Sequence, residues 1–185
     1  MAKIAFINGA PNSSSRLNGL LQLSVSFLEK EKISHDIIDV HKLPSEDLLS
    51  ANYASPVIKE ANARLQEAAG VIVLTPVYKA SYSGILKTYL DLIPQKGLEN
   101  KIILPLVIGG SAAHLLAIEY ALKPVLSALG ANRFISGVYV VDQQIERIAD
   151  HQFTISDEAE ARLMARMKEL TVNLNNWKGA GINVS

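Results

Sequence analysis

Short apolar runs rich in valine, isoleucine and leucine alternate along this chain with longer stretches that have helical spacing. We predict strands over residues 3–8, 35–40, 70–75, 102–109 and 137–142. The runs at 71–74 and 102–108 are apolar without alternation, as expected for strands that helices cover on both faces. These strands therefore pair in parallel, and Pro105, which has no N–H to donate, predicts a locally irregular strand.

The stretches between these runs predict helices, and their spacing is that of an apolar stripe on one helix face. We expect helices over residues 15–30, 57–68, 82–93, 115–129 and 156–176. A helix follows each strand, which is typical of an α/β fold with an open, doubly wound sheet. A five-stranded parallel sheet favours the flavodoxin-like order 2-1-3-4-5, with helices on both faces.

The chain reads as a single domain over residues 1–176, since it contains no internal repeat, low-complexity tract or linker. Residues 177–185 lose the helical periodicity and are predicted to be a C-terminal tail. The segment 143–154 has no clear pattern, and two alternatives stay open for it: it covers a neighbouring subunit or lies free.

Composition excludes several classes of function. Lysine plus arginine and aspartate plus glutamate both total 18, and no segment concentrates enough positive charge to bind nucleic acid. No apolar run is long enough to cross a membrane, and the N-terminus lacks the pattern of a signal peptide. The absence of cysteine excludes disulfides and thiolate metal sites, and we expect a cytoplasmic protein.

The candidate site is formed by the loops that follow the first, third and fourth strands, because ligands bind at the carboxyl ends of neighbouring strands in this fold. The first loop, 8–16, ends in Ser13, Ser14, Ser15 and Arg16 and opens directly into a helix. Backbone N–H groups, hydroxyls and one guanidinium suit a terminal phosphate. The alternative is a serine-capped helix after a tight turn. The loop lacks the glycine patterns of nucleotide P-loops and dinucleotide sites, so a monophosphate such as that of FMN fits best.

The other two loops offer a flat surface and a second region of small residues. The third strand continues into Thr75-Pro76-Val77-Tyr78-Lys79-Ala80-Ser81-Tyr82-Ser83-Gly84, against which a planar ring stacks or which is an ordinary surface loop. The fourth strand leads into 109–114, which ends at His114. His114 is a helix-terminal residue, a flavin contact or a pyridine-nucleotide contact. Lys79 either attracts the phosphates of a pyridine nucleotide or lies in solvent.

Groups for metal or acid–base catalysis are scattered. The four histidines have no ligand spacing. We interpret Asp91, Glu119 and Asp142 as solvated or helix-interface groups. We therefore predict no metal site and no catalytic side chain.

In these loops the sequence closely resembles the NADPH-dependent FMN reductases that serve two-component alkanesulfonate monooxygenases. The resemblance covers most of residues 3–142, including 75–84 and 114–126. It implies an oxidoreductase that transfers hydride from NADPH to FMN and hands the reduced flavin to a monooxygenase of sulfonate metabolism. It also implies a homodimer or homotetramer. The first loop departs from the family at Ala10, Pro11 and Asn12, where serine followed by proline and arginine is common.

The resemblance assigns roles to residues at matching positions. Ser15, Arg16 and the backbone of Leu17, in the same loop as Ser13, would hold the FMN phosphate. The isoalloxazine ring would lie along Pro76, Val77, Tyr78, Lys79 and Ser81, with Gly110 and Ser111 near its pyrimidine end. His114 follows in the same loop.

Tyr120 occupies a position at which similar reductases carry a tyrosine that inserts one residue into the helix and creates a π-bulge. Pro124 independently predicts an irregularity, because a proline within a helix crowds the carbonyl four residues earlier, which is that of Tyr120. The alternative is a simple kink with an ordinary interface tyrosine. The resemblance links this segment to the subunit interface and to flavin acting as a substrate that leaves the enzyme.

Two other functions stay open from the sequence. One is a reductase of quinones, azo dyes or chromate that retains FMN tightly and has similar loops. The other is a flavodoxin-type electron carrier, against which the neutral charge argues, because such carriers are usually strongly acidic.

Overall fold

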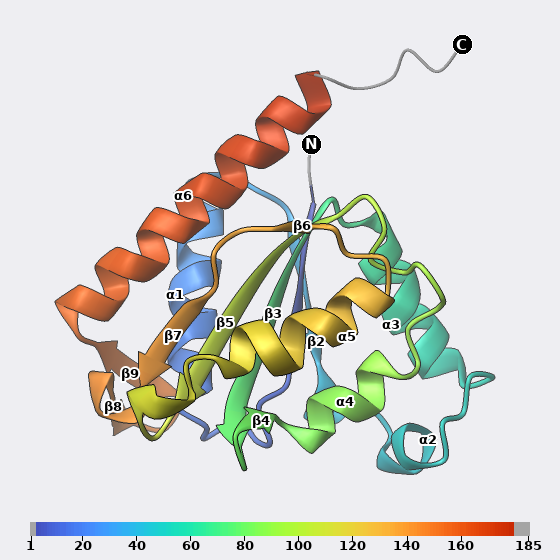
Figure 1. The fold of residues 1–185 in the computed structure, drawn as a ribbon, viewed down its shortest axis with the longest axis horizontal. Helices are drawn as coiled ribbons and strands as arrows, with labels where there is room; N and C mark the ends of the chain where they lie inside the picture. Colours follow the sequence, from blue (N-terminus) through green and yellow to red (C-terminus); the bar gives the residue numbers. More distant parts are fainter. Residues whose placement is uncertain (1–2, 180–185) are drawn as a thin grey trace.

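A twisted sheet with helices on both faces forms the body of the molecule in a computed structural model that describes residues 3–179 (Figure 1). Its parallel strands are β1 (Ile4–Asn8), β2 (His35–Asp39), β3 (Gly70–Tyr78), β5 (Ile102–Gly109), β6 (Arg133–Phe134) and β7 (Val138–Val141). They lie in the order β2-β1-β3-β5, with β6 and β7 both alongside β5. The predicted order 2-1-3-4-5 is confirmed, with the fifth strand divided into two short segments.

The division of the last strand coincides with Pro105 in the middle of β5. The amide of Ile135 donates to the carbonyl of Ile103 (2.8 Å), so alternate residues of β5 from Ile103 onward direct their backbone groups toward β6 and β7. Pro105 is the next residue in that series and has no N–H. The pairing stops after Ile103 and resumes at Leu106, which confirms the predicted irregularity.

The unalternating apolar runs are explained by two cores, one on each face of the sheet. Successive residues of a strand point to opposite faces, and in β3 Val71 and Val73 belong to one core while Ile72 and Leu74 belong to the other. Helices α1 (Leu17–Lys30) and α6 (Asp157–Gly179) cover the second core, which contains Ile72 and Leu74. The first is covered by α3 (Pro56–Glu67), α4 (Gly84–Leu90) and α5 (Lys123–Ala128), with a short helix α2 (Ser45–Leu49).

Local capping explains where the helices begin. The Ser55 and Ser83 hydroxyls accept hydrogen bonds from the first turns of α3 and α4. Helix α4 begins later than the predicted 82–93 because Tyr82 belongs to β4 (Ser81–Tyr82), which pairs with the end of β3, and it ends earlier, at Leu90. The 3-10 turn η1 (Val40–Lys42) and α2 fill a region for which we predicted no element.

The predicted helix over 115–129 is wrong as a single regular helix. A 3-10 turn η2 (Ala112–His114) precedes this region, which itself contains a π-helical segment η3 (Ile118–Leu122) followed by α5, with Pro124 in the first turn of α5. Tyr120 is at the centre of η3, so the expected π-helical irregularity is confirmed.

The C-terminal part also differs from expectation. Segment 143–154 contains a 3-10 turn η4 (Asp142–Gln144) and most of the antiparallel hairpin of β8 (Ile145–Ala149) and β9 (Gln152–Ile155). Helix α6 continues to Gly179, into the predicted tail, and residues 180–185 lie outside the described range. Among the described helices, none combines the length and apolarity needed to span a bilayer.

Candidate functional site

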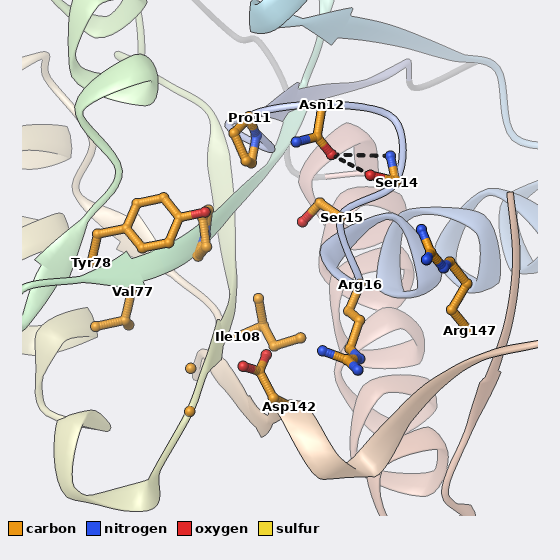
Figure 2. A pocket seen from close by; sticks show the side chains of 13 residues that line it. Pro11, Asn12, Ser14, Ser15, Arg16, Val77, Tyr78, Ile108, Asp142 and Arg147 are labelled. Carbon is orange, nitrogen blue, oxygen red and sulfur yellow. Dashed lines mark hydrogen bonds between the residues drawn. The ribbon is translucent and has the colours of Figure 1, made fainter. Parts of the chain in front are cut away.

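A cavity of about 380 Å³ opens where β1, β3 and β5 end, as the strand order predicts (Figure 2). It is lined by Pro11, Asn12, Ser14, Ser15, Arg16, Pro76, Val77, Tyr78, Ile108, Gly109, Gly110, Asp142 and Arg147. A second cavity of about 620 Å³ shares Val77 and Gly110 with the first. The two therefore form a continuous depression across the three loops.

Polar groups concentrate at the loop between β1 and α1. The side-chain oxygen of Asn12 accepts hydrogen bonds from the amide (3.1 Å) and hydroxyl (2.9 Å) of Ser14, and the Ser15 hydroxyl accepts one from the amide of Leu17 (3.3 Å). Arg16 is exposed, and its guanidinium makes no hydrogen bond or ion pair within residues 3–179. The loop thus presents hydroxyls and a free guanidinium at the start of a helix, which suits an anion.

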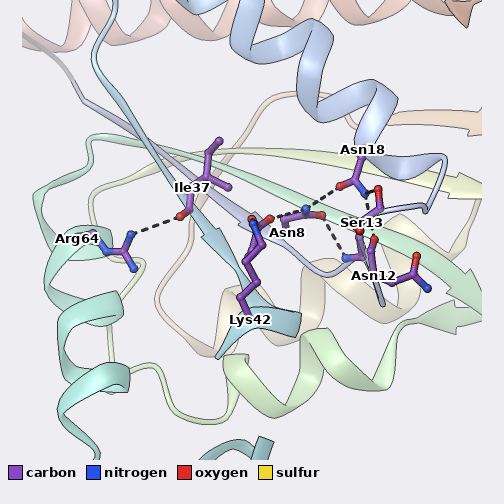
Figure 3. Close-up of polar contacts among 9 residues, drawn as sticks. Asn8, Asn12, Ser13, Asn18, Ile37, Lys42 and Arg64 are labelled. Carbon is purple, nitrogen blue, oxygen red and sulfur yellow. Dashed lines mark hydrogen bonds and ion pairs between the residues drawn. The ribbon is translucent and has the colours of Figure 1, made fainter. Parts of the chain in front are cut away.

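A buried amide network holds this loop on the sheet (Figure 3). The Asn8 side chain donates to Asn18 (3.0 Å) and Asp39 (2.8 Å) and accepts from the amide of Ala10 (3.2 Å). Asn18 in turn donates to the carbonyls of Asn12 (3.1 Å) and Ser13 (3.0 Å). Asn8 and Asn18 are both buried, so the shape of the loop depends on side chains behind it.

Asp39 ends this network and pairs with Lys42 at 2.7 Å. Burial raises the pKa of its carboxyl, but hydrogen bonds from Lys42 and Asn8 outweigh that effect and hold the pKa below its ordinary value of 3.8. The ionised form is therefore favoured by folding. Its contribution to stability is present above the unfolded-state pKa and is lost as the pH falls through the folded-state pKa.

We expect Asp39→Asn to lower the free energy of unfolding at neutral pH, with the difference from wild type narrowing below about pH 3.8, the ordinary pKa. Urea unfolding of both proteins over a pH series measures this. Asp150→Asn, at the exposed tip of the β8–β9 hairpin, is the control. A difference that persists unchanged in acid would contradict the assignment.

The loop after β3 supplies the flat side of the cavity. Pro76 is buried, whereas Tyr78 is 52% exposed at the cavity wall. The buried Thr75 hydroxyl accepts from the amide of Ser83 (2.9 Å), and the Ser83 hydroxyl donates to the carbonyl of Gly9 (3.0 Å). The first and second loops are thereby linked.

The turn between β3 and β4 is strained. Lys79 and Ala80 have φ values of 50° and 63°, in the left-handed region that favours glycine. We expect Ala80→Gly to raise the free energy of unfolding by about 0.5–1 kcal/mol, because it removes the steric cost of a Cβ there. Ala165→Gly, exposed in the middle of α6, should lower it by about 1 kcal/mol in the same denaturation assay. Destabilisation by both would show that the turn is not strained.

The loop after β5 is positioned by a tyrosine of the next strand. The Tyr139 hydroxyl donates to the carbonyl of Ser111 (2.7 Å). Its ring crosses the space that a Cβ at Gly109 would occupy, so only glycine allows this approach. Burial of the Tyr139 side chain raises the pKa of its phenol, and the nearby Asp142 carboxylate raises this pKa further. The phenol therefore keeps the proton that it donates in this hydrogen bond.

The sequence-predicted site residues fall into three groups. Ser15, Arg16, Pro76, Val77, Tyr78 and Gly110 line the first cavity, and Lys79, Ser111 and His114 line the second with Val77 and Gly110. Ser13, Leu17, Ser81 and Tyr120 line neither. The Leu17 side chain is fully buried in the core, so only its backbone faces the loop. Tyr120 is 79% exposed on η3.

Sequence reasoning missed Asp142 and Arg147. We interpreted Asp142 as a solvated or helix-interface group, but it follows β7 and lines the cavity, because β7 runs parallel to β5 and ends at the same edge. That topological position was the available signal. Asp91 and Glu119 instead pair with Lys87 and Lys123 on the surface, as expected. Arg147 gave no signal, since its hairpin was not predicted.

The cavity suits a planar ring that carries a phosphate. Its anion-binding groups lie on the β1–α1 loop, and Pro76, Val77 and Tyr78 provide an apolar and aromatic wall on another element. Figure 2 shows these two parts on different sides of one opening.

Comparison with known proteins gives a consistent result. The profile of the family described as NADPH-dependent FMN reductase matches residues 2–146. The chain is 45% identical to FMN reductase (NADPH) of Pseudomonas putida over 142 residues, 77% of this chain and 72% of that protein. It is also 45% identical to FMN reductase (NADPH) of Escherichia coli K12 over 143 residues, 77% and 75% of the two chains. A crystal structure of an NADH:FMN oxidoreductase (EMOB) in its apo form superimposes with a TM-score of 0.83 and 31% identity, covering 94% of this chain and 90% of that one.

Proposed function

Because the chain belongs to the family of NADPH-dependent FMN reductases, we propose that it transfers hydride from NADPH to FMN and then releases the reduced flavin. The observation that carries this proposal is the cavity itself, with Arg16 and serine hydroxyls on one side and Tyr78 on the other. This proposal is supported by sequence identity over most of the chain and by the loops after β1, β3 and β5, which line one cavity.

The flavin-binding residues are proposed from the resemblance and from the cavity lining. Ser15, Arg16 and the backbone amide of Leu17, next to Ser13, hold the phosphate. The ring lies along Pro76, Val77, Tyr78, Lys79 and Ser81, and the remaining contacts come from Gly110, Ser111 and His114. Ser81 supports this wall from β4 without lining the cavity.

The protein's contribution to the reaction is alignment. When bound, FMN supplies the redox chemistry by accepting hydride. Val77 and Gly110 line both cavities, and the second cavity would receive the nicotinamide nucleotide next to the flavin. Lys79 and His114 line the second cavity, where Lys79 attracts the phosphates of NADPH. No side chain needs to exchange a proton with the reacting carbon for this transfer.

The assay that tests this function follows NADPH oxidation by purified protein with and without added FMN. Activity that requires added FMN, with little flavin retained on purification, supports the proposal. Activity that needs no added flavin but demands a quinone or dye would identify a reductase with tightly bound FMN. A stable semiquinone with negligible NADPH oxidation would identify an electron carrier.

The reduced flavin has a proposed recipient and the enzyme a proposed assembly. We infer delivery to an FMNH2-dependent monooxygenase of sulfonate metabolism in the cytoplasm, following the family resemblance. We also infer a homodimer or homotetramer that covers Leu115, Leu116 and Tyr120, which follow His114 along the chain and are 50%, 54% and 79% exposed. Sedimentation of the purified protein tests the assembly.

Deletion of Tyr120 tests whether the π-helical segment makes flavin a substrate. Removing one residue from η3 is expected to restore regular α-helical hydrogen bonding. The variant should then retain more FMN through gel filtration and depend less on added FMN. Tyr120→Ala, which keeps the residue count, is the matched control for loss of the side chain alone. A deletion variant that loses FMN as readily as wild type would contradict the link.

A further inference from the structure

Arg147 is a second guanidinium at the mouth of the first cavity, and the residues matched by the family profile end just before it. It lies on β8, in the hairpin that follows the flavodoxin-like sheet. Figure 2 shows its side chain extending toward the Asn12–Arg16 loop from the side opposite Tyr78. The proposed hydride transfer assigns no role to this residue.

The hairpin that carries Arg147 is anchored to α1, so its position relative to the loop is defined. Ile145 is buried, and both it and Phe153 contact the helix at Gly19, where a Cβ would lie 3.1 and 3.0 Å from their atoms. The Gln22 side chain donates to the carbonyl of His151 at 2.9 Å. The same helix therefore supports the anion-binding loop at its start and the hairpin along its side.

The charges around this end of the cavity favour a dianion. The side chains of Arg147 and Arg16 are both exposed, and in the described part of the chain neither guanidinium makes a hydrogen bond or ion pair. Asp142 also lines the cavity, but its carboxylate forms no ion pair with either arginine. Two free guanidiniums against one carboxylate leave net positive charge beside the hydroxyls of Ser14 and Ser15. A phosphate monoester carries close to two negative charges at neutral pH.

We propose that the β8–β9 hairpin is a phosphate clamp in which Arg147 binds a phosphate monoester from the side opposite the Asn12–Arg16 loop. The inference rests on the proposed function, which supplies two such groups: the 5′-phosphate of FMN and the 2′-phosphate of NADPH. The shared cavity with Ser15 and Arg16 favours the FMN phosphate. Arg147 is then a specificity-determining residue for ligands that carry this group.

Ligand pairs that differ only in the monoester test the clamp. In Arg147→Ala, the dissociation constant of FMN, measured by quenching of flavin fluorescence, should rise about tenfold or more while that of riboflavin is unchanged. Arg147→Lys keeps the positive charge but lacks the planar guanidinium, so its dissociation constant for FMN should lie between those of wild type and Arg147→Ala. Lys168→Ala, exposed on α6, makes the same change in net charge and should have no effect.

The remaining outcomes distinguish the 5′-phosphate of FMN from the 2′-phosphate of NADPH as the ligand of Arg147. They also distinguish a failure of the clamp from a failure of the proposed function. In Arg147→Ala, the KM for NADPH could rise while the KM for NADH and the affinity for FMN stay unchanged. That result supports the clamp and identifies the 2′-phosphate of NADPH as its ligand. Unchanged values for both FMN and NADPH would overturn it. If wild type fails to oxidise NADPH in the presence of FMN, the proposed function is wrong, yet the ratio of FMN to riboflavin affinity still decides the role of Arg147.

A second variant moves the hairpin without removing the arginine. Gly19→Val places methyl groups against Phe153 and Ile145 and should displace the hairpin. Its FMN affinity should fall in the same direction as that of Arg147→Ala, and adding Arg147→Ala to it should weaken binding little further. Full additivity in the double variant would show that Arg147 does not act from this hairpin position.

Discussion

Replacing Arg16 by alanine is expected to raise the dissociation constant of FMN by about 10- to 150-fold, which corresponds to the 1.5–3 kcal/mol of a hydrogen bond to a charged group. Arg16 lines the cavity, and its exposed guanidinium has no protein partner within residues 3–179, so the substitution removes a ligand contact and no internal side-chain contact. Stability should therefore change little. Titration of FMN by fluorescence and thermal unfolding of the same samples measure both quantities.

The control for this experiment separates a specific contact from a general effect of charge. Lys168→Ala lowers the net charge equally at a distance from the cavity and should leave the affinity unchanged. High salt should reduce the effect of Arg16→Ala, since part of the interaction is electrostatic. An FMN affinity equal to that of wild type would remove Arg16 from the site.

The second large effect is expected from Asn8→Ala, in the network behind the loop. Truncation leaves the Asn18 side chain, the Asp39 carboxylate and the Ala10 amide each short of one partner in a buried region. We expect a loss of about 2–4 kcal/mol in the free energy of unfolding. FMN affinity should also fall, because Asn18 then orients the carbonyls of Asn12 and Ser13 less firmly.

Asn132→Ala is the matched control, since it removes the same side chain at an exposed position. Urea unfolding gives the stability difference, and FMN titration below the unfolding transition gives the affinity. A variant that is destabilised but binds FMN normally would limit Asn8 to a structural role. A variant with wild-type stability would contradict the network as described.

The sheet could be predicted from the sequence because burial on both faces leaves a clear mark. Runs such as Val71–Leu74 have no polar position, and the residues really do divide between two cores. The region after residue 109 was harder. A π-helical turn and a 3-10 turn interrupt the helical spacing there, and only Pro124 signalled the change locally.

The β8–β9 hairpin was not predicted because its usual signals are absent. Only Ile145 is fully buried in β8, so the strand shows little alternation, and its turn uses His151 at a φ of 59° in place of glycine. Arg147 consequently carried no local signal, whereas the position of Asp142 follows from the end of the predicted strand 137–142. The position of Arg147 near Arg16 arises from tertiary packing between segments more than a hundred residues apart, which periodicity does not report.

The division of the last strand at Pro105 bears on how easily another chain pairs with this edge of the sheet. A long, straight outer strand offers a row of unpaired backbone donors and acceptors to which another chain adds, and this is a common route to aggregation. Here the outer boundary of the sheet beside β5 consists of β6 and β7, which are two and four residues long and are separated by a break. An incoming strand finds no continuous template, so the proline limits edge-to-edge polymerisation and leaves self-association to side-chain surfaces.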